Sequence, residues 1–405
     1  MRINIQRLST FLRDVNKFGA LPGGGVSRPS LSDEDKKARD WFAGHVTALG
    51  LNLQVDEIGN MFGVWPGRTQ KIIGTGSHLD TVPTGGLYDG ALGVTAGLEV
   101  FSLLKEKNYQ PNHTLVLTNF TNEEGTRFTP DMMGSLGYAN PQLIPDLYKS
   151  IANDDGRSIG DELKRIGYLG SMRCGSLAFD RFVELHIEQG PILEQANQDI
   201  GVVEAVQSIH WKRITIEGRS AHAGTTPVEY RRDSFYAMSC LAVQARELCI
   251  KEKGLMITIG TMQLVPNVIN VVPKKVIATI DLRHPDDGVA KKALEEIQAF
   301  TNQHPSFNGL HTSWEDLVDI NAIKFDPRVV AAIEKSCFSL GLTSRRMISG
   351  AGHDAQLLSS KYPSAMIFIP SKNGVSHAID EFSSEDQIEK GANVLLQTLL
   401  ELDSL

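Results

Sequence analysis

The 405-residue chain is poor in cysteine and has no long apolar run. Its cysteines, Cys174, Cys240, Cys249 and Cys337, are scattered and form no CxxC pair, which argues against a disulfide framework. No segment approaches the roughly 18 apolar residues that a membrane span needs. The N-terminus also lacks the apolar core of a secretory signal. These absences predict a reduced, cytoplasmic protein with buried structural thiols and no membrane partner.

Blocks of basic residues are also missing. The net charge is -8, and the 40 Lys and Arg residues form no dominant cluster, so nothing in the charge favours nucleic acid or an anionic membrane surface. The 41% hydrophobic and 22% charged content is that of a soluble globular protein. We therefore expect a small-molecule partner, and a length of 405 residues predicts two or three domains.

Strand-like and helix-like segments alternate along most of the chain, which is typical of an α/β sheet. Ser32 is expected to cap a helix that ends at Gly50. The segments that follow are strands at 52–55 and 61–65, strand KIIGTGS, helix ALGVTAGLEVFSLLKEK, strand TLVLTNF, and later strands FVELHIE and SAMIFIP.

A second pattern begins near residue 208. The pattern predicts a compact β-α-β-β-α unit. Its segments are strand WKRITIEG, a helix over about 228–253, strands LMITIGTMQLV and VIATIDLRH, and helix KKALEEIQAF. Near residue 318 the chain reverts to helix and loop. The simplest interpretation is one α/β domain, 1–207 with 318–405, interrupted by a smaller α/β domain over 208–317, because insertion at an exposed loop is well tolerated.

Residues able to bind metal stand at the ends of four predicted strands of the larger domain. They are His78, the doublet Glu123-Glu124, His186, and His377 in the loop after SAMIFIP. Ligand sites of open α/β sheets gather at the carboxyl ends of strands. We therefore expect these side chains to meet, although a turn-rich segment such as GSHLDTVPTGGLYDG can also hold a hydrogen-bonded loop histidine.

The residue types suit Zn²⁺ or Mn²⁺ because they combine imidazoles with carboxylates. Asp89 has two carboxylate oxygens and could bridge two ions roughly 3.5 to 4 Å apart. Asp80 follows His78 by two residues and could orient its imidazole. In the doublet, Glu124 is interpreted as the ligand and Glu123 as the general base, the alternative being a solvated acidic turn.

Eight motifs are spread along the chain: GSHLDTV, YDGALG, TNEEGTRF, ELHIEQGPILE, GRSAHAGTTP, NVINVVP, DLRH and GVSH. Together they resemble the hydantoinase/carbamoylase branch of the M20 metallopeptidase superfamily. This branch comprises N-carbamoyl-L-amino-acid hydrolases, β-ureidopropionases and allantoate amidohydrolases. The resemblance runs in order over nearly the whole chain. It implies a zinc-peptidase-like α/β/α catalytic domain and an inserted two-layer α/β domain that acts as lid and dimer interface.

The resemblance also implies roles for single residues. The metal ligands would be His78, Asp89 (bridging), Glu124, His186 and His377, holding two divalent ions, Zn²⁺ or else Mn²⁺ or Co²⁺. Glu123 would be the base, and Asp80 would support the metal ligand His78 without binding metal itself. The substrate-binding residues would be Gln189, His222, Asn270, Arg283 and Gly352, with His222 stabilising the oxyanion, often across the dimer. Arg283 also suits bidentate binding of a carboxylate, the alternative being an exposed arginine at a strand end.

The expected function is hydrolysis of an N-carbamoyl amino acid, a small ureido substrate with a carboxylate, to amino acid, carbon dioxide and ammonia. Allantoate amidohydrolase is the alternative, since it would use the same metals and the same Arg283. A non-catalytic metal-stabilised scaffold is the alternative of another class, and Glu123 argues against it because a structural site needs no base. The segment SHAIDEFS departs from relatives that place a proline-containing turn after the last histidine.

Overall fold

The computed structural model describes all residues, Met1–Leu405, as two compact units. The larger unit contains Met1–Glu204 and Lys324–Leu405, and the smaller unit is the insert Ala205–Ile323. The insert therefore begins three residues before and ends six residues after the range 208–317 expected from the sequence. None of the helices is both long enough and apolar enough to cross a membrane.

The larger unit is built on a nine-stranded mixed sheet with the strand order β1-β2-β4-β3-β5-β15-β6-β13, in which β14 pairs with β6. The strands are β1 (Asn52–Val55), β2 (Met61–Trp65), β3 (Ile72–His78), β4 (Thr114–Phe120), β5 (Arg181–Ile187), β6 (Ile200–Val206), β13 (Ile323–Lys324), β14 (Ser344–Ser349) and β15 (Ser364–Ile369). The four central strands β4, β3, β5 and β15 run parallel to one another. They are almost entirely buried, which explains their continuous apolar sequences.

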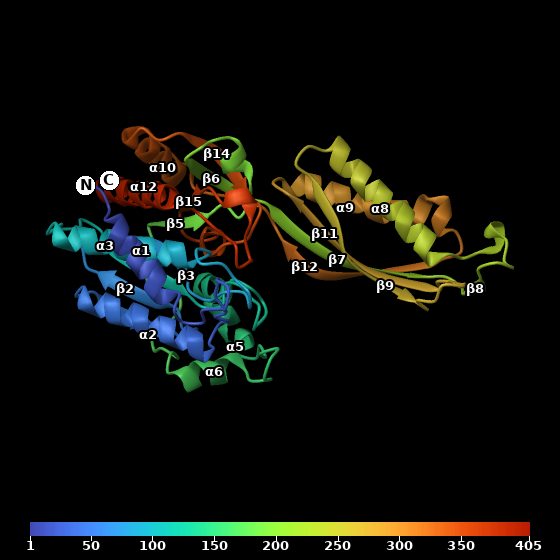
Figure 1. The fold of residues 1–405 in the computed structure, drawn as a ribbon, viewed down its shortest axis with the longest axis horizontal. Helices are drawn as coiled ribbons and strands as arrows, with labels where there is room; N and C mark the ends of the chain where they lie inside the picture. The colour runs from blue at the N-terminus through green and yellow to red at the C-terminus, as the bar shows by residue number, and fades with distance from the viewer. The chain divides into compact units, whose positions relative to one another are not determined.

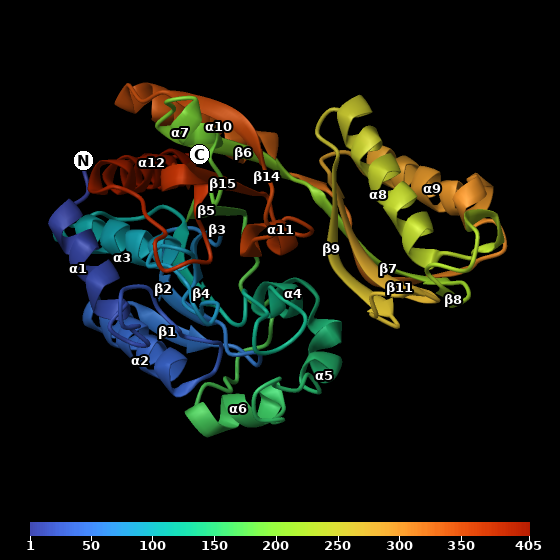
Figure 2. The ribbon, with the colours of Figure 1, turned by 45° about the vertical axis from the view of Figure 1, so that its right-hand side comes forward.

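Helices cover both faces of this sheet (Figures 1 and 2). The helices of the larger unit are α1 (Ile5–Val15), α2 (Asp33–Ala48), α3 (Ala91–Glu106), α4 (Met133–Ala139), α5 (Ile144–Leu147), α6 (Ile159–Ile166), α7 (Ile192–Gln195), α10 (Pro327–Leu340), α11 (Asp354–Leu358) and α12 (Glu385–Asp403), with short 3-10 turns at Pro141–Leu143 and Lys372–Gly374. On one face, α3 packs on β3 and α12 packs on β5 and β15. On the other, the Tyr138 ring of α4 packs against Phe62 and Phe120.

Local sequence explains where the first long helices begin and end. The Ser32 hydroxyl accepts a hydrogen bond from Asp35 N at the start of α2, as its sequence predicted. Helix α3 is buried along nearly its whole length, because it lies between the sheet and the helices α1 and α12. The chain entering α3 supplies Asp89 and Gly90, so this rigid helix fixes one side of the site described below.

The insert is a four-stranded antiparallel sheet with the order β12-β7-β11-β9 and two long helices. Its elements are β7 (Ser208–Glu217), β8 (Ala221–His222), α8 (Ser234–Lys251), β9 (Met256–Val265), β10 (Val271–Val272), β11 (Lys275–His284), α9 (Asp287–Gln303) and β12 (His311–Ile320), with 3-10 turns at Val228–Tyr230 and Pro305–Phe307. The core lies between helices and sheet, where Leu241 and Ile297 pack with Ile214, Val276 and Ile280.

Two expectations for the insert were wrong. The helix expected from residue 228 begins at Ser234, because the Asp233 carboxylate caps it by accepting from Phe235 N and Tyr236 N. The strand β12 was missed altogether, and the expected boundary at 317 falls inside it. Its charged, half-exposed sequence HTSWEDLVDI carries a weak strand pattern, and its pairing with β7 over most of its length supplies the order that the sequence does not reveal.

Candidate active site

Two buried histidines and one exposed histidine meet at the carboxyl ends of the parallel strands, with Asp89 between them. His78 is the last residue of β3, His186 is the penultimate residue of β5, and His377 lies in the loop after β15. His186 Nε2 lies 3.1 Å from Asp89 Oδ1, and His78 Nε2 lies 3.7 Å from the same oxygen. His377 Nε2 lies 3.3 Å from the other oxygen, Oδ2.

The hydrogen bonds of two of these imidazoles fix their tautomers. His78 Nδ1 lies 3.0 Å from the Asp80 carbonyl oxygen, and His186 Nδ1 lies 2.9 Å from that of Ile187. A carbonyl only accepts, so each Nδ1 carries a proton, and each Nε2 is the ring nitrogen that faces Asp89. His78 Nε2 is buried and has no hydrogen-bond partner of its own.

The two glutamates of the doublet lie in different positions beside Asp89. The Glu124 carboxylate forms a group with Asp89 and His377, with Glu124 Oε2 3.4 Å from His377 Nε2. Glu123 Oε2 instead lies 3.4 Å from His78 Nε2. His78, Asp89 and His186 form the second such group. Every ion pair of Asp89, Glu123 and Glu124 is made with a histidine, so no Lys or Arg neutralises this buried acidic cluster directly.

Asp80 supports the site in a different way from that expected. Its carboxylate is 3.9 Å from His78 Nδ1, and its backbone carbonyl accepts the hydrogen bond of that nitrogen. The two carboxylate oxygens accept instead from Glu123 N at 3.2 Å and Glu124 N at 3.3 Å. Asp80 therefore orients the histidine with its backbone and the glutamate doublet with its side chain.

Gly90 is required by the close packing of the site. Its φ is +63°, and a Cβ built there would lie 2.3 to 2.4 Å from three atoms of the His78 ring. Any larger residue would displace the imidazole from Asp89. The glycine thus allows helix α3 to begin directly against a ligand residue.

Burial and mutual repulsion alter the pKa values throughout the cluster. Burial raises the pKa of Glu123 well above its usual range, and the nearby carboxylates of Asp354, Glu124 and Asp89 raise it further. Burial also raises the pKa of Glu124 well above its usual range, and the Asp89 carboxylate raises it further. Burial lowers the pKa of His78 to about 4. Burial also opposes charge on His186, but its hydrogen bond to Asp89 raises its pKa to about 9.

The residues expected to bind substrate divide between the two units. In the larger unit, the Gln189 amide donates to Asp89 Oδ2 at 2.8 Å, so this side chain belongs to the cluster. Gly352 lies beside Met132, whose Cε would be 2.8 Å from an added Cβ. His222, Asn270 and Arg283 belong to the insert.

Within the insert, His222 and Asn270 lie together. His222 on β8 pairs with Val271 on β10, and Ala223 N donates to the Asn270 carbonyl at 3.0 Å. His222 Nδ1 accepts from Gly224 N at 3.0 Å, which leaves the proton on its exposed Nε2. This small ribbon therefore presents an imidazole N–H donor to solvent.

Arg283 lies at the other end of the insert. It pairs with Ile209, whereas Lys275, next to the His222 ribbon, pairs with Glu217 at the opposite end of the same strands. Eight residues of extended strand separate Lys275 from Arg283, which is roughly 26 Å at 3.3 Å per residue. Arg283 Nε and Nη2 both donate to the Asp281 carboxylate at 2.9 Å. The structure therefore does not bring Arg283 together with His222 and Asn270 within one insert.

Comparison with known proteins identifies the family of the chain. Residues 74–401 match Peptidase family M20/M25/M40. The chain belongs to this family. The N-carbamoyl-L-amino-acid amidohydrolase of Rhizobium meliloti is 36% identical over 99% of this chain and 97% of its own length. The allantoate amidohydrolase of Escherichia coli K12 is 35% identical over 98% of both chains.

A solved structure is similar over the same range. The hydantoinase/carbamoylase family amidase from Burkholderia multivorans has a TM-score of 0.94 and 38% identity, covering 99% of this chain and 98% of its own. The resemblance drawn from the sequence motifs, the α/β fold and the amidohydrolase activity are thereby confirmed. This M20 chain is a hydrolase of C–N bonds other than peptide bonds, and its substrate is a small molecule.

M20 enzymes are metal-dependent, and the donor set of this chain fits divalent ions. Two triads share Asp89, namely His78-Asp89-His186 and Asp89-Glu124-His377, and within each triad the ligand atoms lie within 4.8 Å of one another. The unpartnered Nε2 of buried His78 is the orphan atom that a metal would satisfy. A dication would also neutralise carboxylates whose pKa is otherwise raised.

The sequence interpretation of this M20 site missed several buried residues. Glu184 precedes His186 by two residues, so both face the same side of β5; it accepts from Ser77 Oγ and Ala355 N. His353, left open in the sequence, packs its ring 4.5 Å from that of His186. Asp354 is fully buried and accepts from Ser135. The alternation of side chains along β5 would have identified Glu184 from the sequence. The places of His353 and Asp354 in the site depend instead on the position of α11.

The loop SHAIDEFS supports the site by holding Asp89. Glu381 Oε1 accepts from Tyr88 N at 3.0 Å and Asp89 N at 3.1 Å. Glu381 Oε2 accepts from Ser376 Oγ, which also donates to Asp89 Oδ2 at 3.1 Å. This loop therefore holds Asp89 through both backbone and side chain.

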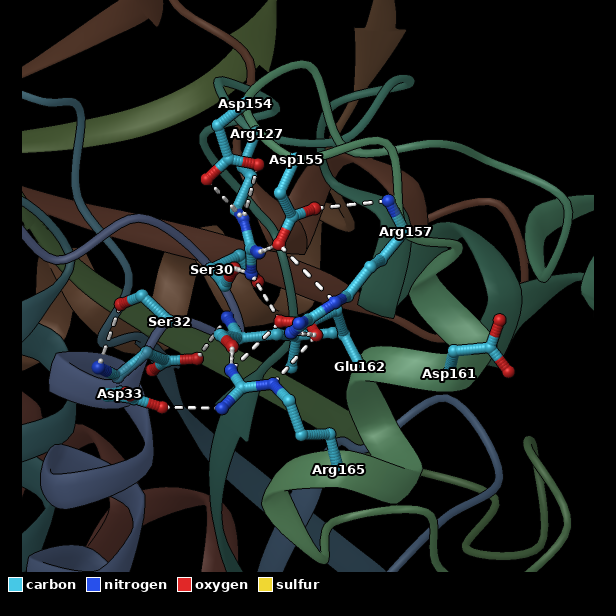
Figure 3. Close-up of polar contacts among 12 residues, drawn as sticks. Ser30, Ser32, Asp33, Arg127, Asp154, Asp155, Arg157, Asp161, Glu162 and Arg165 are labelled. Atoms are coloured by element: carbon cyan, nitrogen blue, oxygen red, sulfur yellow. Dashed lines mark hydrogen bonds and ion pairs between the residues drawn. The ribbon is translucent and has the colours of Figure 1, made fainter.

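An ion network anchors the loop that follows the glutamate doublet (Figure 3). Arg127 donates to the Ser30 carbonyl and to buried Glu162, and it also pairs with Asp154 and Asp155. Glu162 receives further hydrogen bonds from Arg157 and Arg165, and its pKa falls to about 2 because these hydrogen bonds outweigh the cost of burial. The network ties the loop after Glu124 to helix α6.

Proposed function

We propose that the chain is an N-carbamoyl-L-amino-acid amidohydrolase, which converts its substrate and one water to the amino acid, carbon dioxide and ammonia. The main observation in support is the position of Asp89. Its Oδ1 faces His78 and His186, and its Oδ2 faces His377, as a carboxylate shared by two ions requires.

Two divalent ions, Zn²⁺ or else Mn²⁺ or Co²⁺, would be held by the residues of the two triads. His78, Asp89 and His186 would bind the first, and Asp89, Glu124 and His377 the second. When bound, such ions lower the pKa of water and polarise a carbonyl oxygen. Elemental analysis of a fully active preparation should find two ions per chain; one tightly bound ion or none would remove the two-ion proposal.

Glu123 is the proposed general base. It is buried, lies beside the first triad and belongs to neither metal group. It takes a proton from the attacking water and later delivers it to the leaving nitrogen. Asp80 keeps this carboxylate in place through the backbone of the doublet. The intact base also argues against a scaffold that merely contains metal.

Residues of the insert would complete the site. The Nε2–H of His222 suits the developing oxyanion, and the Arg283 guanidinium suits the substrate carboxylate. Because roughly 26 Å of strand separates Arg283 from Lys275, which lies next to the His222 ribbon, one small substrate cannot touch both Arg283 and His222 of the same insert. We therefore infer that a site takes Arg283 from one subunit and His222 with Asn270 from another.

Exposed apolar side chains support a homodimer formed through the insert. Helix α8 exposes Tyr236 by 59%, Val243 by 60% and Ile250 by 76%. A face of this kind is typical of an interface. The insert would then act both as lid and as dimer contact, and a lid that closes over the substrate would exclude water.

Allantoate is the second candidate substrate, because allantoate amidohydrolases from Bacillus subtilis and Escherichia coli are as similar as several carbamoylases. The deciding experiment measures ammonia release from N-carbamoyl-L-amino acids, N-carbamoyl-β-alanine and allantoate with the metal-loaded protein. The highest kcat/KM should belong to an N-carbamoyl-L-amino acid. A preference for allantoate would replace the first proposal by the second, and no ammonia from any of them would reject both.

A further inference from the structure

A fully buried arginine contacts the segment of chain that presents His78. Arg28 lies between helices α1 and α2 and is 0% exposed. Its Nε donates to the carbonyl oxygen of Leu79 at 2.6 Å. Leu79 stands between His78, a proposed metal ligand, and Asp80, whose carboxylate accepts from the backbone of the glutamate doublet. The guanidinium therefore holds the backbone that connects these two residues.

The same side chain also contacts the end of helix α1. Arg28 Nη1 donates to the carbonyl oxygens of Val15 at 2.9 Å and Phe18 at 2.8 Å. Val15 is the last residue of α1, where carbonyl groups have no partner inside the helix. One planar guanidinium thus links the end of α1 to the Leu79 carbonyl, since its donors point in several fixed directions.

The backbone of Arg28 pairs with the same loop after β3. Arg28 N donates to Thr81 Oγ1 at 2.8 Å, and Thr81 N donates to the Arg28 carbonyl at 2.9 Å. Further along, Val26 and Gly85 exchange backbone hydrogen bonds of 3.0 and 2.9 Å. The contacts of Arg28 are those nearest in sequence to His78, so this residue joins the loop pairing to the end of β3.

Stability alone does not explain a charged side chain at this position. Burial lowers the pKa of Arg28 to about 10, against the opposing effect of the Asp35 and Asp80 carboxylates, so the guanidinium stays charged at neutral pH. Its Nη2 is buried without a hydrogen bond. Burial of charge costs free energy that an apolar side chain of similar volume would avoid. What the arginine supplies instead is a set of donors to carbonyls of two separate segments.

We infer that Arg28 is a positioning residue for the metal ligand His78. By holding the Leu79 carbonyl it sets the direction of the backbone from His78 to Asp80. That direction orients the imidazole, because His78 Nδ1 lies 3.0 Å from the Asp80 carbonyl oxygen that accepts its hydrogen bond. The inference rests on the proposed function, since it takes His78 as a ligand. Loss of this link should weaken metal binding at the triad that contains His78 and spare the other triad.

Two proteins with one triad each separate these effects. His377→Ala, the first-triad protein, keeps His78-Asp89-His186, and His78→Ala, the second-triad protein, keeps Asp89-Glu124-His377. Zn²⁺ is titrated calorimetrically into each full-length, metal-stripped protein with a competing chelator, with and without Arg28→Lys. Lysine keeps the charge, but its compact ammonium group cannot link α1 to the Leu79 carbonyl. The Kd should rise about 10- to 100-fold in the first-triad protein and stay within about twofold in the second.

Arg39→Lys in the first-triad protein is the matched control. Arg39 is also buried, at 1% exposure, and it also donates to more than one segment, through Asp35, the Gly59 carbonyl and Thr121. None of these hydrogen bonds reaches residues 78–81. The control therefore removes an equally buried guanidinium and keeps its charge, and it should leave the Kd for Zn²⁺ within about twofold.

Thr81→Val tests the same link without changing the guanidinium. It removes the acceptor of Arg28 N and should weaken Zn²⁺ binding about two- to tenfold in the first-triad protein only; this variant decides the question if circular dichroism shows that Arg28→Lys does not fold. An unchanged Kd in the first-triad protein, or equal losses in both proteins, would overturn the inference and leave the proposed function intact. A first-triad protein that binds no Zn²⁺ with Arg28 in place would contradict the triad itself, and with it the proposed function.

Discussion

The carboxyl ends of the central strands, here called the sheet edge, and the insert differ in how they hold their functional side chains. At the sheet edge, His78, Asp89 and His186 are nearly fully buried and each is fixed by named hydrogen bonds. In the insert, His222 and Asn270 are exposed. The insert also carries 12 of the 21 exposed large apolar side chains, although it makes up less than a third of the chain.

This difference indicates two kinds of preorganisation. The sheet edge holds the proposed ligands and base together within one unit, whereas the insert carries exposed apolar side chains and polar groups that lie far apart. A single subunit should therefore bind metal normally and yet lack a complete substrate site. Each of the following predictions tests one side of this contrast.

The largest effect is expected from Glu123→Gln, at the sheet edge. The change keeps size and hydrogen bonding but removes the proton acceptor, so kcat should fall about 10²- to 10⁴-fold, while metal content stays normal. Glu124→Gln is the matched comparison in the neighbouring residue, and it should lose metal from the Asp89-Glu124-His377 triad. Steady-state kinetics with elemental analysis measures both. Near-normal kcat in Glu123→Gln with its metals bound would reverse the assignment of base and ligand.

The insert is tested by mixing two inactive proteins, His222→Ala and Glu123→Gln. If His222 acts across a dimer, random subunit exchange makes about half of the dimers mixed, and half of their sites intact, so about a quarter of full activity should return. Hydrolysis by the mixture is compared with that of each parent. A mixture as inactive as its parents, despite proven subunit exchange, would show that His222 serves its own subunit.

A smaller effect is expected from Arg283→Lys, at the end of the insert opposite His222. An ammonium group cannot reproduce the planar two-point grip on a carboxylate, so KM should rise about 10- to 100-fold with little change in metal content. The comparison is between a carboxylated substrate and the same substrate as its amide. Equal losses on both would mean that Arg283, already paired with Asp281, has only a structural role.

The smallest effect concerns the pH dependence of metal binding at the sheet edge. Without metal, the pKa of Glu124 is raised well above its usual range, and that of His186 is raised to about 9. Both residues must lose their protons to bind a cation, so metal affinity should increase from pH 5.5 to pH 8. Zn²⁺ should then raise Tm more at pH 8, by about 2 to 4 °C for each additional kcal/mol. Thermal unfolding with and without Zn²⁺ measures this; equal increments at both pH values would contradict the assignment of these residues as ligands.

Much of the fold follows from local sequence. The strands β1, β2 and β4 have the expected bounds, because their alternating or continuous apolar patterns are bounded by turn residues. The half-exposed strand β12 could not be identified in this way, since its sequence pattern is weak and its order comes from pairing with β7 and from Trp314, which packs on the core of the insert. Asp80 also shows the limit of sequence spacing. A separation of two residues predicted its position beside His78, but the backbone direction decided that its carbonyl, and not its carboxylate, accepts the hydrogen bond from His78 Nδ1.

The sequence by itself determined the chemical types at the strand ends, because His78, Glu124 and His186 follow or end strands whose apolar patterns are strong. The tertiary structure decided which oxygen of Asp89 faces which histidine, and it added Glu184, His353 and Asp354 to the surroundings of the site. It also placed His222 and Arg283 at opposite ends of the insert. The physical reason is that local patterns fix how a segment folds, whereas strand order and register, set by long-range packing, fix the distances between segments.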